Sequence, residues 1–144
     1  LHVILRFELE LALVNRKLEV KDLPEAWNDL MEQLLGIRPP SDAEGVLQDV
    51  HWSMGAIGYF PTYALGNLFG AQFFNRMEQD IPDADKRIGG GDLLSIRRWQ
   101  QEHIHRYGSV YTAPELIRRV TGESLNPRYF IDYLERKFSR LNVL

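Results

Sequence analysis

The chain contains no cysteine, so disulfide bonds and zinc–thiolate sites are excluded. It also lacks a run of about 18 apolar residues, the length a membrane-spanning helix needs, so we expect no membrane span. The formal net charge of -3 argues against a nucleic-acid-binding protein, because phosphate contacts require clustered Lys and Arg. With neither cysteines nor a signal-peptide pattern, the sequence favours a cytoplasmic location.

Several catalytic motifs that can be recognised by spacing are also missing. No His-Glu-x-x-His occurs, so the usual pair of zinc-binding histidines is absent, and we predict no metal ligand in this chain. His103 and His105 are two residues apart, which would place them on different sides of a helix. No serine lies in a glycine-flanked elbow. The segment Gly89-Gly90-Gly91-Asp92 has no Gly-Lys-Ser/Thr, so we interpret it as a turn with Asp92 as a helix N-cap.

The residues that are present are typical of a globular helical protein. The apolar fraction is 44%, and a chain of 144 residues can bury roughly 70% of its unfolded surface. Apolar residues recur mostly at helical spacing, and no convincing pair of strands is found. We therefore predict an all-α fold of six or seven helices in an irregular array, with residues 1–144 forming a single unit.

The first two predicted helices differ in how clearly the sequence marks them. Residues 1–18 contain the alternating segment 7–11, which could be a strand, but helix-forming residues dominate, so we predict a helix. Because it is apolar on much of its circumference, we expect it to be buried. Asp22-Leu23-Pro24-Glu25 predicts a capped helix start, and Gly36 predicts the end of that helix.

Four later signals mark the remaining helices. Pro61 predicts the start of a helix that runs to about Gln79. Another helix follows Asp92, with candidate core residues Leu93, Ile96, Trp99 and Tyr107. The segment 112–115 predicts a capping box for a helix that ends at Gly122. Asn126-Pro127 opens the last helix, whose expected core face carries Phe130, Leu134, Phe138 and Leu141.

The segment 45–66 departs from any simple period and concentrates polar and aromatic side chains. Asp49 can fix the tautomer of His51, although a lone Asp-x-His is also consistent with a buried histidine tethered for packing. Tyr59 and Tyr63 are four residues apart, so on a helix both phenols would share a face. Converging phenol and imidazole donors would suit a developing oxyanion. The alternative is that both tyrosines pack in the core with their hydroxyls at its edge.

The sequence Gly45-Val46-Leu47-Gln48-Asp49-Val50-His51-Trp52 resembles the Gly-x-x-Gln-Asp-x-His-Trp signature of the carboxypeptidase Taq family of metallocarboxypeptidases. The similarity continues through 53–67 and recurs in the tail at His105 to Tyr111, Glu115-Leu116, Thr121-Gly122 and Tyr129 to Leu134. The resemblance implies an all-α, usually dimeric cytosolic enzyme that removes C-terminal amino acids from peptides with broad preference. It also implies zinc or cobalt, held by the two histidines of His-Glu-x-x-His and a downstream glutamate.

None of those metal-binding motifs occurs in this chain, and the sequence starts in an apolar-rich segment at Leu1, without Met. We therefore expect the C-terminal part of such an enzyme: one wall of its active site, inactive alone. A fragment should also expose apolar surface where the absent part would pack, with residues 1–18 as the expected place, and self-associate through them.

In the setting of this family we hypothesise specific roles for residues of the segment 45–66. His51 would donate to the tetrahedral intermediate or to the terminal carboxylate of the substrate, and Tyr59 or Tyr63 would supply a second donor. Gln48 and Asp49 would orient His51 and the substrate strand, with Trp52 packing behind them. A competing hypothesis is a non-catalytic helical module that binds a protein partner through an aromatic face. An independent enzyme is disfavoured because no full catalytic set can be assembled.

Overall fold

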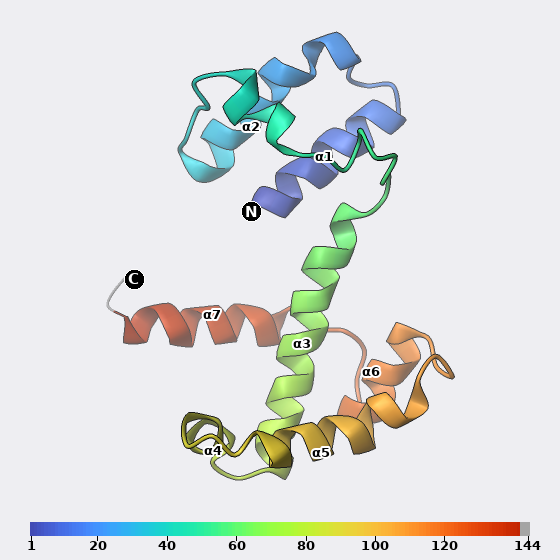
Figure 1. The fold of residues 1–144 in the computed structure, drawn as a ribbon, viewed down its shortest axis with the longest axis vertical. Helices are drawn as coiled ribbons and strands as arrows, with labels where there is room; N and C mark the ends of the chain where they lie inside the picture. Colours follow the sequence, from blue (N-terminus) through green and yellow to red (C-terminus); the bar gives the residue numbers. More distant parts are fainter. Residues whose placement is uncertain (142–144) are drawn as a thin grey trace. The chain divides into compact units, whose positions relative to one another are not determined.

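The computed structural model describes residues 1–141, and within them it is built from helices and connecting turns, without a strand (Figure 1). The predicted all-α class is confirmed. The α-helices are α1 (His2–Val14), α2 (Leu23–Leu35), α3 (Phe60–Asp80), α4 (Ala84–Gly89), α5 (Leu93–His103), α6 (Ala113–Thr121) and α7 (Arg128–Arg140). Short 3₁₀ helices are η1 (Val20–Asp22), η2 (Asp42–Glu44), η3 (Val46–Gln48) and η4 (His105–Tyr107).

The chain divides into two compact units, Leu1–Leu65 and Gly66–Leu144, with the boundary inside α3. The first unit contains α1, α2, the loop with η2 and η3, and the first residues of α3. The second contains the rest of α3 and the helices α4 to α7. No helix in the part of the chain that the structure describes is both long and apolar enough to cross a membrane.

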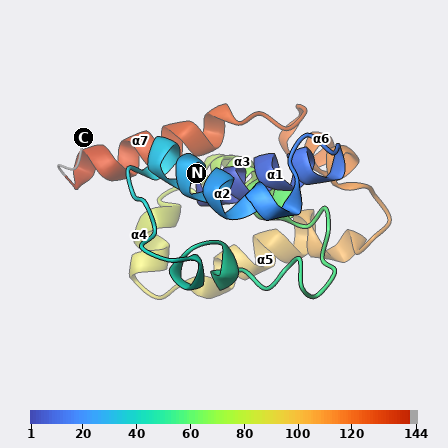
Figure 2. The same cartoon turned by 90° about the horizontal axis from the view of Figure 1, so that it is seen from above.

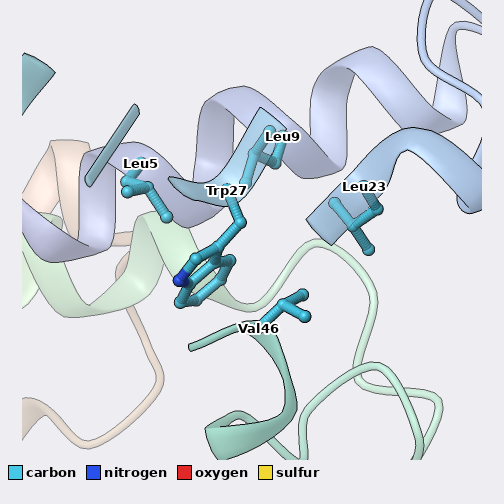
Figure 3. Packing of buried hydrophobic residues seen from close by; sticks show 5 residues of the cluster. All are labelled: Leu5, Leu9, Leu23, Trp27 and Val46. Carbon is cyan, nitrogen blue, oxygen red and sulfur yellow. The ribbon is translucent and has the colours of Figure 1, made fainter. Parts of the chain in front are cut away.

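The core of the first unit forms where α1 packs against α2. Leu5 and Leu9 of α1 meet Leu23 and Trp27 of α2, and Val46 of η3 closes the cluster (Figure 3). Trp27 is only 1% exposed. Burying each of these large side chains contributes about 1.5–3 kcal/mol, so this cluster holds η3, and with it the start of the signature segment, against the two helices.

The expectation that α1 is a buried helix is wrong. Only one side of it is buried, whereas Ile4, Phe7, Leu11 and Val14 lie exposed on the other side. The apolar residues of α1 cover more of its circumference than α2 can bury, so part of this surface faces solvent. The predicted exposed apolar surface on residues 1–18 is thereby confirmed, and self-association through it stays a prediction. The helix also ends at Val14, four residues before Leu18.

The predicted start of α2 is correct in position but wrong in its cap. Asp22 makes no side-chain hydrogen bond to the helix, because η1 runs directly into α2 and leaves Asp22 in a helical conformation. Pro24 lies in the first turn, as predicted. Gly36 ends the helix in the left-handed region at φ 70°, with its N–H donating to the Glu32 carbonyl at 2.9 Å.

The core of the second unit gathers around Met77, Ala84 and Trp99. Figure 2 shows α4 and α5 next to each other, as Figure 1 does, and Ile96 of α5 packs on this cluster. The Trp99 indole N–H donates to Asp80 Oδ2 at 2.9 Å. The short helix α4 was not predicted.

A buried glutamine ties α3 to the chain after α6. Gln72 is 1% exposed, and its amide nitrogen donates to Thr121 Oγ1 at 3.0 Å and to the Ser124 carbonyl at 3.2 Å. Its amide oxygen accepts from the Asn126 backbone N–H at 2.9 Å. Each polar atom of this buried side chain is therefore satisfied, which is what keeps its burial from being costly.

The later helix starts follow the sequence signals, but some predicted core positions do not. Asp92 caps α5 by accepting from Ser95 N–H at 3.2 Å, and Thr112 with Glu115 forms the predicted capping box of α6. The core assignment of Leu93 is wrong, because it is 60% exposed. The predicted core face of α7 is also wrong for Phe138 and Leu141, which are exposed, and no residue of α7 is fully buried within the described residues.

Candidate functional site

The loop between η3 and α3 is shaped by local hydrogen bonds and two glycines. Asp49 Oδ1 accepts from the His51 backbone N–H at 3.2 Å, a short-range turn that aspartate favours. Ala56 N–H then donates to the His51 carbonyl at 2.8 Å, which folds the loop back on itself. Gly55 and Gly58 have φ of 74° and 77°, a region that side chains with a Cβ rarely adopt. The loop is therefore compact, and His51 projects from it.

Both ring nitrogens of His51 have partners. Nδ1 bonds to the Asp49 carboxylate, and Nε2 lies 3.1 Å from the Tyr63 hydroxyl. The Asp49 side chain is 4% exposed, whereas that of His51 is 23% exposed. Since an ionised carboxylate can only accept, the Nδ1 atom carries a proton, and in the neutral imidazole Nε2 accepts from Tyr63.

The two tyrosines lie against the same imidazole. The Tyr59 ring stacks on His51 with ring centroids 5.6 Å apart, and the Tyr63 ring meets His51 edge-on at 6.0 Å. The two phenol rings are themselves 5.2 Å apart. Tyr59 and Tyr63 are 46% and 43% exposed, so this side of the cluster faces solvent. His51, Tyr59 and Tyr63 therefore converge as the sequence predicted, although Tyr59 precedes the first residue of α3.

Electrostatic effects set the protonation of this cluster. Burial raises the pKa of Asp49, but hydrogen bonds from His51 and Arg6 outweigh that effect and hold the pKa below its usual value. Desolvation and the neighbouring Tyr59 raise the pKa of Tyr63. Asp49 is thus a carboxylate and Tyr63 a neutral phenol at neutral pH, which leaves Tyr63 able to donate a hydrogen bond.

The aromatic residues of the loop connect this surface to the core. Trp52 packs edge-on against Trp27 at 6.4 Å and against Phe60 at 5.8 Å. Phe60 is 1% exposed and its ring centroid is 5.0 Å from that of His51. Trp52 and Phe60 therefore form a rigid apolar backing for the loop that carries the imidazole.

Gln48 is placed differently from its neighbours in the signature. Its side chain is exposed, and its amide nitrogen donates to the Ala43 carbonyl rather than to His51. Of the two residues predicted to orient His51, the structure thus brings Asp49 into contact with the imidazole, and it places Gln48 on the surface nearby.

Sequence analysis missed two charged residues of α1 that contact this loop. The Arg6 guanidinium pairs with the Asp49 carboxylate and bonds to the His2 ring, and it lies over the Trp27 ring at 5.3 Å and the Phe60 ring at 5.9 Å. His2, for which the sequence gave no partner, also packs edge-on against Trp27 at 6.0 Å.

The second missed residue is Glu10, which is only 5% exposed. It accepts from the Trp52 indole N–H at 2.9 Å and from the Gly58 backbone N–H at 2.7 Å. The available signal was the pair Arg6 and Glu10 itself, two charges one helical turn apart in an apolar segment. Their partners in the loop lie 42 or more residues further along the chain, which no local pattern reveals.

The side chains that could bind a metal ion are spread over the part of the chain that the structure describes. Within residues 1–141 there is no group of three or more His, Cys, Asp or Glu side chains that could hold a metal ion. The described residues therefore do not fit a metal centre by themselves.

Comparisons with known proteins identify a family. Residues 1–138 match the family model described as carboxypeptidase Taq (M32) metallopeptidase. The chain is 45% identical over 137 residues to thermostable carboxypeptidase 1 of Pyrococcus furiosus, covering 95% of this chain and 28% of that protein. It is 44% identical over 144 residues to carboxypeptidase 1 of Bacillus subtilis, covering 100% of this chain and 29% of that protein.

Solved structures give the same result for the fold. The M32 carboxypeptidase from Deinococcus radiodurans R1 matches with a TM-score of 0.94 at 41% identity, over 99% of this chain and 29% of that one. Metallocarboxypeptidase 1 of Trypanosoma cruzi matches with a TM-score of 0.91 at 42% identity, over 95% of this chain and 28% of that one. The chain thus spans 28% to 29% of the length of these relatives.

Proposed function

Because the chain belongs to the carboxypeptidase Taq (M32) family of metallopeptidases, we propose that it supplies one wall of the active site of a metal-dependent carboxypeptidase. The observation that carries the proposal most is the cluster of Asp49, His51 and Tyr63, hydrogen-bonded in series on a partly exposed surface. It lies in the segment that carries the family's signature. We place the metal ligands outside residues 1–144, since the printed sequence contains no His-Glu-x-x-His.

The proposed chemistry follows from the charge that peptide hydrolysis creates. Attack of water on the scissile carbonyl places negative charge on its oxygen, and donors held in position before the reaction lower the barrier. Tyr63 is such a donor, because its pKa is raised and its phenol is neutral. A phenol has one O–H, so Tyr63 donates to the oxyanion when it turns that proton from His51 Nε2 to the substrate, or when a protonated His51 donates from Nε2 to the phenol oxygen. A protonated His51 that releases Tyr63 could itself donate from Nε2 to the oxyanion or to the terminal carboxylate.

Other residues of the segment 45–66 have supporting roles in this proposal. Asp49 orients the imidazole through Nδ1, and Trp52 packs behind the loop. Tyr59 stacks on His51 and offers a second phenol at the exposed side. Gln48, whose side chain is exposed, is proposed to contact the backbone of the substrate strand.

The family resemblance supports further proposals about the whole enzyme. We propose a zinc or cobalt ion, which would polarise the scissile carbonyl and activate water. The substrates would be peptides, with broad preference for the C-terminal residue. We further propose a cytoplasmic homodimer with no nucleic-acid or membrane partner, in which residues 1–144 belong to one catalytic domain and are inactive alone.

Peptide hydrolysis by the complete protein tests this proposal. With Zn²⁺ or Co²⁺ it should release the C-terminal amino acid from an N-blocked peptide, a chelator should abolish the release, and residues 1–144 alone should release none. Hydrolysis that continues in the presence of the chelator, or a lack of hydrolysis with any divalent ion, would contradict the proposal. A lack of hydrolysis would favour the alternative of a non-catalytic helical module that binds a protein partner through its aromatic face.

A further inference from the structure

We infer that Arg6 and Glu10 of α1 are positioning residues that hold the loop of residues 49–58 at both ends, and thereby set His51 against the two tyrosines. This inference rests on the proposed function and assigns two residues outside the signature to the same site. The Arg6 side chain is 17% exposed and Glu10 is 5% exposed, so both face the loop more than solvent. Each acts through the loop residues that it binds.

Arg6 fixes the start of the loop through the Asp49 carboxylate. Its Nε atom bonds to Asp49 Oδ2, while Oδ1 of the same carboxylate bonds to His51 Nδ1. Each carboxylate oxygen thus has its own side-chain partner, which sets the plane of the carboxylate and therefore the rotation of the imidazole. A second-sphere carboxylate that bonds to one ring nitrogen of a histidine fixes its tautomer and orientation in this way.

The Arg6 guanidinium is itself fixed by its surroundings. It lies over the rings of Trp27 and Phe60, and a second nitrogen donates to the His2 carbonyl at 3.1 Å. A lysine keeps the charge but has neither the planar group that stacks on aromatic rings nor the fork of donors. The position therefore calls for arginine, and not only for a positive charge beside Asp49.

Glu10 fixes the end of the loop. Its Oε2 atom accepts from the Trp52 indole N–H and its Oε1 atom from the Gly58 backbone N–H. Gly58 directly precedes Tyr59, and Tyr59 directly precedes α3. The bond to Gly58 therefore determines where the Tyr59 ring enters its stack on His51.

Both residues lie on one face of the same helix, one turn apart, so α1 holds the two ends of the loop at a fixed separation. Loss of either residue should change the geometry between His51 and the tyrosines without removing any of these three groups. We therefore expect the turnover number to fall while KM changes much less. Partners that orient metal-ligating histidines through hydrogen bonds typically contribute about 10- to 100-fold in activity, and we expect an effect of that order for groups that orient His51.

The test uses Arg6→Gln, Arg6→Lys and Glu10→Gln in the complete, metal-loaded protein. NMR of protein labelled with ¹⁵N in histidine and tryptophan reads the His51 tautomer and the Trp52 indole N–H. We expect a single Nδ1–H form of His51 in the parent protein and mixed tautomers in Arg6→Gln. Arg6→Lys should give an intermediate result. In Glu10→Gln the Trp52 indole signal should move, and kcat should fall about 10- to 100-fold in Arg6→Gln and Glu10→Gln.

Matched controls are Glu8→Gln, an exposed glutamate on α1, and Arg97→Gln, an exposed arginine on α5. Both should leave the NMR signals and kcat unchanged. An unchanged His51 tautomer and kcat in Arg6→Gln would overturn the role of Arg6, and an unchanged Trp52 signal and kcat in Glu10→Gln would overturn that of Glu10. If Arg6→Gln does not fold, Arg6→Lys is used instead: an unchanged His51 tautomer and kcat in Arg6→Lys would overturn the role of Arg6.

The NMR readout does not depend on hydrolysis. A parent protein that hydrolyses no peptide but whose His51 tautomer responds to Arg6→Gln would contradict the proposed function while supporting the positioning role. If the parent protein is active but its His51 tautomer and kcat are unchanged by all three substitutions, the proposed function would be supported and the positioning role contradicted.

Discussion

The Tyr63→Phe substitution tests the chemistry of the site with the smallest structural change. It removes only the hydroxyl that lies 3.1 Å from His51 Nε2 and keeps the ring that packs edge-on against Tyr59 at 5.2 Å. Tyr63 is 43% exposed, so the substitution should change the free energy of unfolding by no more than about 0.5 kcal/mol.

The expected kinetic effect is much larger than the effect on stability. Removing one donor to a developing oxyanion costs about 10²–10³ in kcat, or about 2.7–4 kcal/mol. The donor acts mainly on the transition state, so KM should change little. Tyr59→Phe should cost less, because the structure places the Tyr59 ring in a stack on His51 and the Tyr63 hydroxyl at the imidazole nitrogen.

The assay is steady-state hydrolysis of an N-blocked dipeptide by the complete, metal-loaded protein. Tyr133→Phe is the matched control, since Tyr133 is 39% exposed and belongs to α7, outside the segment 45–66. The control should keep the parent kcat. If Tyr63→Phe also keeps the parent kcat, the phenol does not stabilise the transition state, and the reasoning from its hydrogen bond to His51 is refuted.

Two further predictions concern stability. Leu5→Ala should lower the free energy of unfolding by about 3–5 kcal/mol, because Leu5 is fully buried and its loss leaves a cavity in the core. Leu11→Ala, on the exposed side of α1, should lower it by about 0.5 kcal/mol or less. Chemical denaturation measures both, and equal effects would contradict the assigned faces of α1. Asp49 has a pKa below its usual value of 3.8, so the stability it contributes is present above that value and is lost as pH falls through the lower pKa of the folded state. Asp49→Asn should therefore destabilise the protein at pH 7 and reduce its loss of stability in acid, and an unchanged acid limb in pH-dependent denaturation would contradict this.

Local signals in the sequence predicted where most helices begin and end. Gly36, Asp92 and the capping box at Thr112 and Glu115 each act within one helical turn, so their effect can be read from neighbouring residues. The predicted cap at Asp22 failed because a 3₁₀ turn precedes α2 and continues into it. That turn has no distinctive sequence signal.

Burial was harder to predict than helicity. An apolar stripe shows that a helix can be buried, but the neighbouring elements decide which stripe is covered. In α1 the stripe with Leu5 and Leu9 is buried, and the stripe with Ile4 and Leu11 is exposed. In α7 the predicted core residues Phe138 and Leu141 are exposed for the same reason.

The candidate site also contains residues that the sequence predicts and residues that it does not reveal. His51, Tyr59 and Tyr63 were predicted to converge because they lie close together in the chain and the signature resembles a known family. Arg6 and Glu10 were missed because their contacts with the loop span 42 or more residues. Contacts at that range depend on how α1 packs, which a single sequence does not reveal.

The turnover number of His51→Ala in the complete, metal-loaded protein tests the central claim most directly. The claim is that this imidazole and its tyrosines act on the substrate of a metallocarboxypeptidase. Metal content and the unfolding midpoint serve as controls, so that a loss of activity cannot be assigned to a loss of metal or of fold. We predict that kcat falls by roughly 100-fold or more with both controls unchanged. A kcat equal to that of the parent protein would contradict the claim and reduce His51 to a packing residue.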